Sequence, residues 1–279
     1  MKLYIHTALA ALAGACLASP AFAQDTDDSY SGPYIAVSGG LSAHDNHPGD
    51  VVAFDTNRDG SYDNTVLTST GANAFSPGFC NGSSTLNSNI TTPCERDRDK
   101  VEYAVRHGYD VDEGSNFVAG VLIEGSKSDS TDSVTAFSTT PAGYSFTRGI
   151  DYAVSARARL GFSPGHRGLM YVTGGGSYAR INHQFSTTTT ANRFTPVNPD
   201  KIVFGYQVGG GAEVRIGGRV TLGMEYLYNR YNDDKYYVAI GNGTAGPTNP
   251  FVLAGGVNAR PSDTRYDFHS VRAVLGFKF

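Results

Sequence analysis

Alternation of apolar and polar side chains is the dominant pattern of this chain, and residues 150–162 show it most clearly. One set of alternate positions consists of Tyr152, Val154, Ala156, Ala158, Leu160 and Phe162. The opposite set, which is polar or small, consists of Asp151, Ala153, Ser155, Arg157, Arg159 and Gly161. Because successive side chains of a β-strand point to opposite faces, this segment is predicted to be a strand with one apolar and one charged face.

Seven other segments repeat this alternation. The pattern is weakest where three glycines, 174–176, interrupt one of them. The eight predicted strands are about 33–43, 100–110, 116–126, 150–162, 169–182, 204–215, 220–228 and 265–279. Their length of about ten residues or more is what a tilted strand needs to cross the hydrocarbon of a bilayer.

The connectors between these strands alternate in length. Short turns follow the second, fourth and sixth strands, at 112–114, 163–168 and 217–218, and long connectors follow the others. Outer-membrane barrels have short periplasmic turns, long extracellular loops and an even number of strands. The chain is therefore predicted to be all-β, an eight-stranded antiparallel up-and-down transmembrane β-barrel.

A soluble barrel of the lipocalin type is the alternative, because it also alternates but turns its apolar face inward. Three features favour the membrane form. Connector length differs systematically between the two ends, and Tyr and Phe lie near strand ends on the apolar face, as in an interfacial girdle. The polar face also carries glycines that suit a crowded interior, namely Gly205, Gly209, Gly211 and Gly223.

The first 23 residues have the pattern of a secretory signal peptide. Lys2 supplies the positive start, a short apolar run follows, and residues 21–23 (Ala-Phe-Ala) match the small-x-small cleavage rule. Cleavage would make Gln24 the first mature residue. A lipoprotein leader that uses Cys16 is a weaker alternative, because the residues before it lack the Leu that such signals favour.

Three regions are expected: a signal peptide (1–23), a short, polar and disordered periplasmic segment (24–31), and the barrel domain (32–279). Charged residues make up 17% of the chain, below the quarter to a third that is common on soluble surfaces. Removing Lys2 from the 22 Lys and Arg leaves 21 against 26 Asp and Glu. This mildly acidic balance is not the footprint of a nucleic-acid-binding protein.

Three segments carry a resemblance to a known family: GPYI at 32–35, EYLY at 225–228 and VRAVLGFKF at 271–279. They resemble the OmpA-like and porin-family surface antigens with a small outer-membrane β-barrel domain, over essentially the whole mature chain. The resemblance implies location in the outer membrane of a Gram-negative bacterium. It also implies insertion by the barrel-assembly machinery, which in this family reads an aromatic terminal strand, here Phe277 and Phe279. No peptidoglycan-binding domain follows Phe279, so wall anchoring is not expected.

Charged side chains recur on the face predicted to point into the barrel. They are Glu102, Arg106, Glu124, Asp151, Arg157, Arg159, Glu213, Arg215, Glu225, Arg272 and Lys278. An eight-stranded barrel leaves little room beyond its own side chains, and buried charges must be paired. These residues are therefore interpreted as a core of ion pairs, with a conduction path as the alternative. Removing Arg157, Arg159, Glu124 or Glu225 is expected to destabilise the barrel.

Two cysteines remain after cleavage, Cys80 and Cys94, and both lie in the first long connector. Oxidation is permitted in an exported protein, so a disulfide is predicted, closing a ring of about 15 residues. A metal site is less favoured, because no His or second Cys pair stands nearby.

Residues 55–63 of the same connector resemble a calcium-binding loop. Oxygen-bearing side chains recur at every second position, at Asp55, Asn57, Asp59, Ser61 and Asp63, and Gly60 permits a sharp turn. Val66 stands where an EF-hand supplies its bidentate Glu, so the loop is closer to the short Asp-rich repeats of extracellular proteins. The alternative is a polar Asx-type turn. No cofactor is required, and calcium is the one candidate.

Enzymatic constellations are not persuasive. His269 and Ser270 are adjacent on a strand, so their side chains face opposite ways and cannot form the Ser–His pair of a lipid-modifying barrel. His166 and Arg167 lie in a short turn, and a His44–His47 pair alone is poor evidence for a metal.

The protein is therefore expected to be non-catalytic, with a structural and surface-interaction role and four mobile extracellular loops. A narrow porin that passes small solutes or ions is the alternative. The expected partners are outer-membrane lipid and lipopolysaccharide, the barrel-assembly machinery during insertion, and unidentified extracellular ligands, but not nucleic acid.

Overall fold

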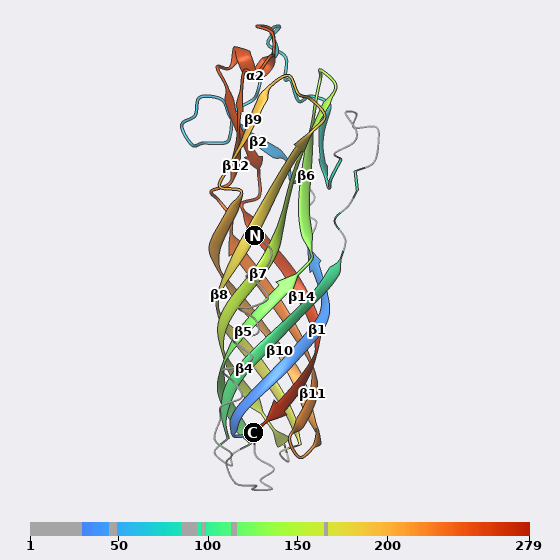
Figure 1. The fold of residues 1–279 in the computed structure, drawn as a ribbon, viewed down its shortest axis with the longest axis vertical. Helices are drawn as coiled ribbons and strands as arrows, with labels where there is room; N and C mark the ends of the chain where they lie inside the picture. Colours follow the sequence, from blue (N-terminus) through green and yellow to red (C-terminus); the bar gives the residue numbers. More distant parts are fainter. Residues whose placement is uncertain are drawn as a thin grey trace, which may run out of the picture.

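The computed structural model describes residues 30–44, 49–84, 94, 95, 97, 99–112, 116–164 and 167–279. Eight long antiparallel strands close a barrel (Figure 1): β1 (Gly32–His44), β4 (Lys100–Asp112), β5 (Phe117–Ser128), β7 (Ala142–Phe162), β8 (Gly168–Thr187), β10 (Asp200–Gly217), β11 (Val220–Asn232) and β14 (Arg265–Lys278). β1 pairs with β4 and β14, and the β7–β8 pairing completes the ring. The predicted fold class is confirmed.

The alternation along each strand separates two surfaces. On β7, Leu160 is 63% exposed on the outside, whereas Arg159 is 2% exposed on the inside. The same contrast holds on β14 between the exposed Leu275 and the buried Arg272. An apolar exterior and a charged interior are the arrangement that hydrocarbon around a barrel requires, and each of the eight described barrel strands is paired on both sides.

Signal-peptide residues 1–23, with the alternative site at Cys16, lie outside the described residues. The segment 24–31 was expected to be disordered, and this expectation is wrong for its last two residues. Tyr30 is fully buried in the barrel, and the Ser31 hydroxyl donates to the Asp112 carbonyl oxygen at 3.1 Å. In the described part of the chain, no helix is long and apolar enough to cross a membrane.

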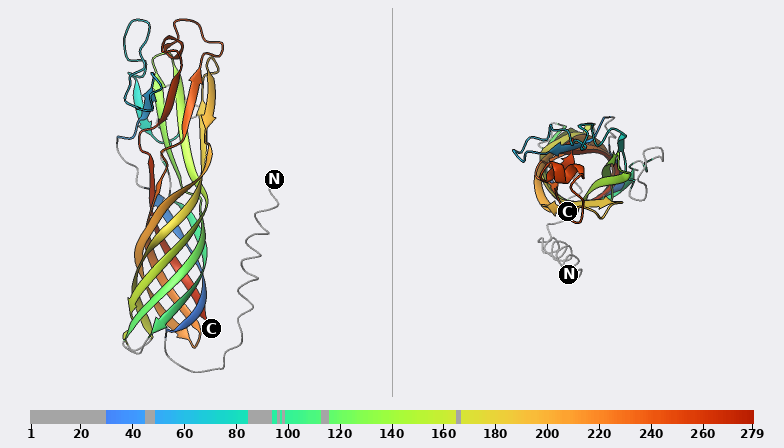
Figure 2. Two further views of the ribbon diagram at one scale, coloured as in Figure 1. Left: turned by 90° about the vertical axis from the view of Figure 1, so that its left-hand side faces the viewer. Right: turned by 90° about the horizontal axis from the view of Figure 1, so that it is seen from above.

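Above the barrel, the long connectors fold into two further sheet regions (Figures 1 and 2). The upper halves of β7 and β8 continue the barrel wall, and β6 (Thr131–Ser138) pairs with β7 while β3 (Gly78–Asn81) pairs with β6. A separate four-stranded sheet has the order β2 (Val52–Asp55), β13 (Val257–Pro261), β12 (Tyr237–Gly241) and β9 (Arg193–Val197). The four-stranded sheet, β3, β6, the upper halves of β7 and β8, and the short helix α2 (Pro250–Leu253) are together called the extracellular cap.

The extracellular cap encloses an apolar core of its own. Phe75 stacks on Phe54 with ring centroids 4.4 Å apart and meets Tyr144 edge-on at 5.5 Å. Phe251 of α2 and Val238 of β12 are buried against the same cluster. The connectors were expected to be mobile loops. Over the described residues this expectation is wrong, because aromatic side chains from all four connectors pack together.

A β-bulge in β7 marks the level at which the barrel passes into the cap. Ile150 pairs with Ile181 and Tyr152 with Arg180, which leaves Asp151 as an extra residue. Below the bulge odd-numbered side chains such as Arg159 face inward, and above it even-numbered ones such as Phe146 do. The extra residue therefore lets one strand line a charged lumen and then an apolar core.

Candidate functional site in the lumen and the neck

A six-residue ion cluster fills the middle of the barrel and is called the central cluster. Its members are buried side chains from β4, β5, β7, β11 and β14. They are Arg106, Arg157, Arg272, Glu102, Glu124 and Glu225. Three guanidinium groups face three carboxylates, so the cluster is formally neutral.

Glu225 is the centre of this network. Its carboxylate accepts from Arg272 at 2.6 Å, from Arg106 at 2.8 Å and from Arg157 at 3.5 Å. The Tyr171 hydroxyl donates to the same carboxylate at 2.8 Å. Charges this deeply buried are tolerated only when paired, and here each arginine meets more than one acid.

Glu124 and Glu102 complete the cluster. Glu124 accepts from Arg157 at 2.8 Å and from Arg272 at 3.0 Å. Glu102 accepts from Arg272 at 3.1 Å and also from the Ser270 hydroxyl. The strands supply these residues from around the ring, so their side chains cross-link opposite walls of the barrel.

A second charged layer lies nearer the periplasmic end. Arg159 pairs with Asp110 and, at 3.1 Å, with Glu213, and Lys278 lies 3.1 Å from Asp110. Two cations again meet two acids. Arg159 also lies over the Tyr34 ring at 4.6 Å.

Tyr30 lies at the mouth beneath this layer. Lys278 donates to its carbonyl oxygen, and the Arg215 guanidinium lies over its ring at 5.0 Å. Tyr30 and Asp110 were missed at the sequence level. Asp110 has the same parity as Arg106 on its strand, so the alternation could have found it; nothing in the sequence marked Tyr30.

A third charged group lies where the barrel meets the cap and is called the neck cluster. Arg148 donates to Asp132 at 2.7 Å and to Asp233 at 3.3 Å. His183 Nε2 lies 2.7 Å from Asp233, and His44 Nε2 lies 3.3 Å from Asp132. Arg148 also donates to the backbone carbonyls of residues 263 and 265. The neck cluster thus joins the ends of all four long connectors.

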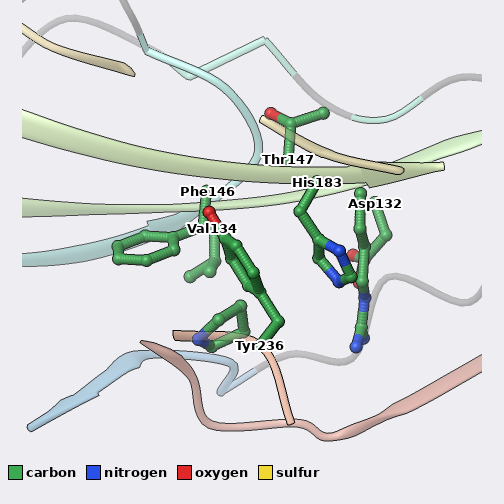
Figure 3. Close-up of a pocket in the computed structure, with 8 residues that line it drawn as sticks. Asp132, Val134, Phe146, Thr147, His183 and Tyr236 are labelled. Atoms are coloured by element: carbon green, nitrogen blue, oxygen red, sulfur yellow. The ribbon is translucent and has the colours of Figure 1, made fainter. Parts of the chain in front are cut away.

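Figure 3 shows Asp132 and His183 of the neck cluster beside Val134, Phe146 and Tyr236 of the cap core. The His183 ring stacks on Tyr236 with centroids 4.0 Å apart. The space enclosed there is about 10 Å³, at the lower limit for one water molecule. The site is therefore a packed junction rather than a ligand pocket.

The acids of the neck cluster are held ionised. Burial alone would raise the pKa of Asp132, but the Arg148 charge and the His44 hydrogen bond outweigh it and hold that pKa well below its usual range. Burial likewise opposes ionisation of Asp233, whose pKa is lowered by the His183 hydrogen bond and by Arg148. Both carboxylates therefore tie the cap to the barrel at neutral pH.

One residue assigned to the lumen lies elsewhere. Asp151 is the extra residue of the β7 bulge, and its side chain is 46% exposed on the outside, 3.5 Å from Arg180. The strict alternation through residues 150–162 therefore misplaces it. The other residues of the predicted lumen set face inward.

The predicted disulfide is confirmed: Cys80 of β3 is joined to Cys94, with Cα atoms 6.3 Å apart. It attaches the outermost strand of the cap to the end of the first connector. The predicted calcium loop, 55–63, lies at the end of β2. Among the residues that the structure describes, no three His, Cys, Asp or Glu side chains already converge as a metal cluster. Calcium binding stays a prediction.

The histidines considered for catalysis or metal binding are separated. His269 lies on the outer face against Tyr226, whose hydroxyl is 2.6 Å from His269 Nδ1, while Ser270 points inward to Glu102. His44 belongs to the neck cluster. His47 and His166 lie outside the described residues.

Comparison with known proteins agrees with this architecture. No family model matches the chain. The 31 kDa outer-membrane immunogenic proteins of Brucella melitensis and Brucella suis are each 27% identical over 175 residues, which is 63% of this chain and 65% of theirs. The chain thus matches slightly less than two thirds of the length of these relatives.

Solved structures of outer-membrane proteins also align with it. OprG of Pseudomonas aeruginosa is 10% identical over 90% of this chain and 99% of its own, with a TM-score of 0.49. Neisserial surface protein A is 12% identical over 89% of this chain and 98% of its own, with a TM-score of 0.37.

The closed barrel, its apolar exterior and the relatives define a small outer-membrane β-barrel protein. Its location is the outer membrane of a Gram-negative bacterium. The narrower resemblance to OmpA-like antigens and the assembly role of Phe277 and Phe279 stay predictions; both side chains are exposed on the outer face of the barrel end.

Proposed function

We propose that this protein is a non-conducting, non-catalytic barrel that holds a folded cap at the cell surface for structural support and contact with external partners. The central cluster is the observation that carries this proposal. Its six charged side chains are at most 2% exposed and are bonded across the lumen.

Conduction would require this cluster to part. A permeating ion would have to displace contacts such as Arg272–Glu225 at 2.6 Å and Arg106–Glu225 at 2.8 Å. Removing one partner of a buried ion pair typically costs about 3–5 kcal/mol, because the other charge is left without compensation. The periplasmic layer and the neck cluster add two further obstacles on the same axis. These contacts favour a closed barrel over the narrow porin.

The cap supports the surface-interaction part of the proposal. It projects beyond the lipid-facing belt and is stabilised by an apolar core, a disulfide and the neck cluster. The Brucella relatives are named immunogenic, which fits a part of the molecule that faces the outside. A rigid cap presents one defined surface and loses less entropy on binding than mobile loops would.

Lipopolysaccharide is proposed as the lipid partner. Arg230 faces outward just above Tyr228, at the level where the apolar belt ends. Arg180 lies at the same level above Tyr178, already 3.5 Å from both Asp151 and Asp200. Guanidinium groups bind phosphate well, so these residues suit the phosphorylated headgroups of the outer leaflet. Insertion by the barrel-assembly machinery is proposed on the terminal aromatic strand alone.

Planar-bilayer recording on purified folded protein tests the proposal. The wild type is expected to give no steady single-channel steps. The double variant Glu225→Ala, Arg272→Ala removes one charge of each sign and keeps the cluster neutral, and it is expected to stay closed because the periplasmic layer and the neck cluster still block the axis. A conducting porin reconstituted in the same way proves the assay. Steady, reproducible steps from the wild type would favour the porin.

A further inference from the structure

The strand β2 ends at Asp55 in a turn whose side-chain oxygens are already organised. Asp55 Oδ2 accepts from the Gly60 amide at 3.1 Å, and Asp59 Oδ1 accepts from the Ser61 amide at 2.7 Å. Asn57 Oδ1 accepts more weakly from the Asp59 amide at 3.4 Å. Gly60 has φ of +91°, which a side chain would disfavour. These bonds turn the chain around the Asp55 carboxylate.

The second oxygen of that carboxylate has no partner. Asp55 is fully buried, and its Oδ1 accepts no hydrogen bond from any residue that the structure describes. A buried, unsatisfied carboxylate oxygen costs free energy, and native proteins rarely leave one without a donor or a cation. Since Oδ2 is bonded to Gly60 across the turn, the carboxylate faces the interior of the loop.

The two nearby arginines do not neutralise it. Arg58 donates to the carbonyl oxygen of Gly255 at 2.6 Å. Arg260 donates to the carbonyl oxygen of Asp234 at 3.1 Å and lies over the Tyr62 ring at 3.9 Å. Neither forms an ion pair with an acid of the loop within the described part of the chain. The loop thus keeps its negative charge.

We propose that residues 55–63 form a calcium site. Its oxygen donors are Asp55, Asn57, Asp59, the backbone carbonyl of Ser61 and Asp63. Hard cations such as Ca²⁺ take oxygen ligands only, and this spacing places a donor at the first, third, fifth, seventh and ninth positions. The orphaned oxygen of Asp55 is the donor that the cation satisfies.

The site is open on one side before the ion binds. Asp63 Oδ1 accepts from the side-chain amide of Asn64 at 3.0 Å, and Asp59 Oδ2 accepts from the side-chain amide of Asn57 at 2.8 Å. Among the described residues no three acids converge as a metal cluster, so Asp55, Asp59 and Asp63 are not yet gathered around one point. Binding is expected to draw in Asp63, which is exposed.

The twelfth position explains both the affinity and the role of the site. An EF-hand places a bidentate Glu there, whereas Val66 is 1% exposed in the cap core. Phe54, directly before the loop, is buried in the same core. The loop therefore loses a ligand, which gives the weak affinity of extracellular modules (roughly 10⁻⁴–10⁻³ M). In return, calcium couples directly to packing of the cap.

Terbium luminescence on the full chain in detergent micelles tests the site. Tb³⁺ replaces Ca²⁺ in oxygen sites, and Tyr62 lies inside the loop as a sensitiser in a chain without tryptophan. Sensitised emission is expected to appear and to be displaced by millimolar Ca²⁺. Millimolar Mg²⁺ should displace it at least tenfold less effectively, because Mg²⁺ demands a compact octahedral shell.

Two exposed acids give variants that keep the fold. Asp59→Asn and Asp63→Asn should each weaken Ca²⁺ displacement at least tenfold, and Asp129→Asn, an acid of another connector, should not. Resistance of the cap to proteolysis should rise with Ca²⁺ in the wild type and in Asp129→Asn alone. Emission that Ca²⁺ does not displace, equal displacement by Mg²⁺, or equal affinity in all the variants would overturn the calcium assignment.

Discussion

The barrel and the cap of this protein have opposite interiors. Inside the barrel, Arg106 and Arg272 are buried and both pair with Glu225, while Leu160 and Val172 are exposed outside. Inside the cap, aromatic rings such as Phe75 are buried against apolar neighbours. One chain therefore builds two cores of reversed polarity, one above the other.

The solvent outside each region accounts for this reversal. Hydrocarbon around the barrel takes the apolar side chains, so the charges are left inside and must neutralise one another. Water around the cap leaves the ordinary hydrophobic effect to bury its aromatics. β7 passes through both regions, and its bulge at Asp151 changes which parity of side chains faces inward.

Loss of Glu225 should have the largest effect on this arrangement. Glu225→Ala leaves Arg106, Arg157 and Arg272 with too few acids in a buried site, which typically costs about 3–5 kcal/mol. Urea unfolding of the reconstituted barrel, followed by tryptic resistance and heat-modifiable migration, measures it. A midpoint equal to that of the wild type would exclude a paired core.

Truncation in the cap should be felt in the cap alone. Phe75→Ala removes a ring that packs on Phe54, Tyr144 and Phe251, and is expected to cost about 3 kcal/mol. Limited proteolysis should cut the cap faster while the barrel keeps its migration. Leu253→Ala, which is 50% exposed on α2, is the matched control and should change little. Equal loss of barrel and cap would contradict separate cores.

Acid should loosen the junction between the two regions. The pKa values of Asp132 and Asp233 lie below their usual range, because Arg148 and the two histidines favour the ionised forms. Their stabilisation is fully present above the ordinary pKa of an aspartate, about 3.9, and is lost progressively as the pH falls from there through the lowered pKa values of the folded state. Cap proteolysis by pepsin at pH 2 to 5 measures this loss. In the double variant Asp132→Asn, Asp233→Asn the rate of cap proteolysis should depend less on pH. A double variant with the same pH profile as the wild type would show that the neck cluster is not the source of the pH dependence.

A substitution at Asp151, on the outer face of the barrel at the β7 bulge, should have the smallest effect on stability. Asp151→Ala removes a half-exposed ion pair with Arg180 at 3.5 Å, for which less than about 1 kcal/mol is expected. The same urea assay as for Glu225 applies. A loss as large as that of Glu225→Ala would return Asp151 to the lumen.

The barrel could be read from the sequence because lipid imposes a period of two on every spanning strand. Parity alone placed Glu225 and Arg272 inside and Leu275 outside. It failed at Asp151, since a bulge inserts a residue without a marked sequence signal. Which arginine pairs with which acid depends on the register of the strands around the barrel, and the alternation of side chains gives no information about that register.

The cap could not be predicted in the same way. β2, β9, β12 and β13 are only four or five residues long, too short for alternation to be recognised. β2 pairs with β13, about 200 residues later in the chain. The residues of the neck cluster lie at the ends of all four long connectors, and no local pattern joins them.

An accessibility scan along the outer face of β8 tests the reversal of polarity most directly. This strand has no bulge of its own against β10, and its outward positions run from Val172 and Tyr178 in the belt to Asn182 and Gln184 in the cap. Spin labels at these sites in native membranes should be relaxed by oxygen at Val172 and Tyr178, and by a water-soluble nickel complex at Gln184. Preferential relaxation by the nickel complex at Val172 would contradict the account.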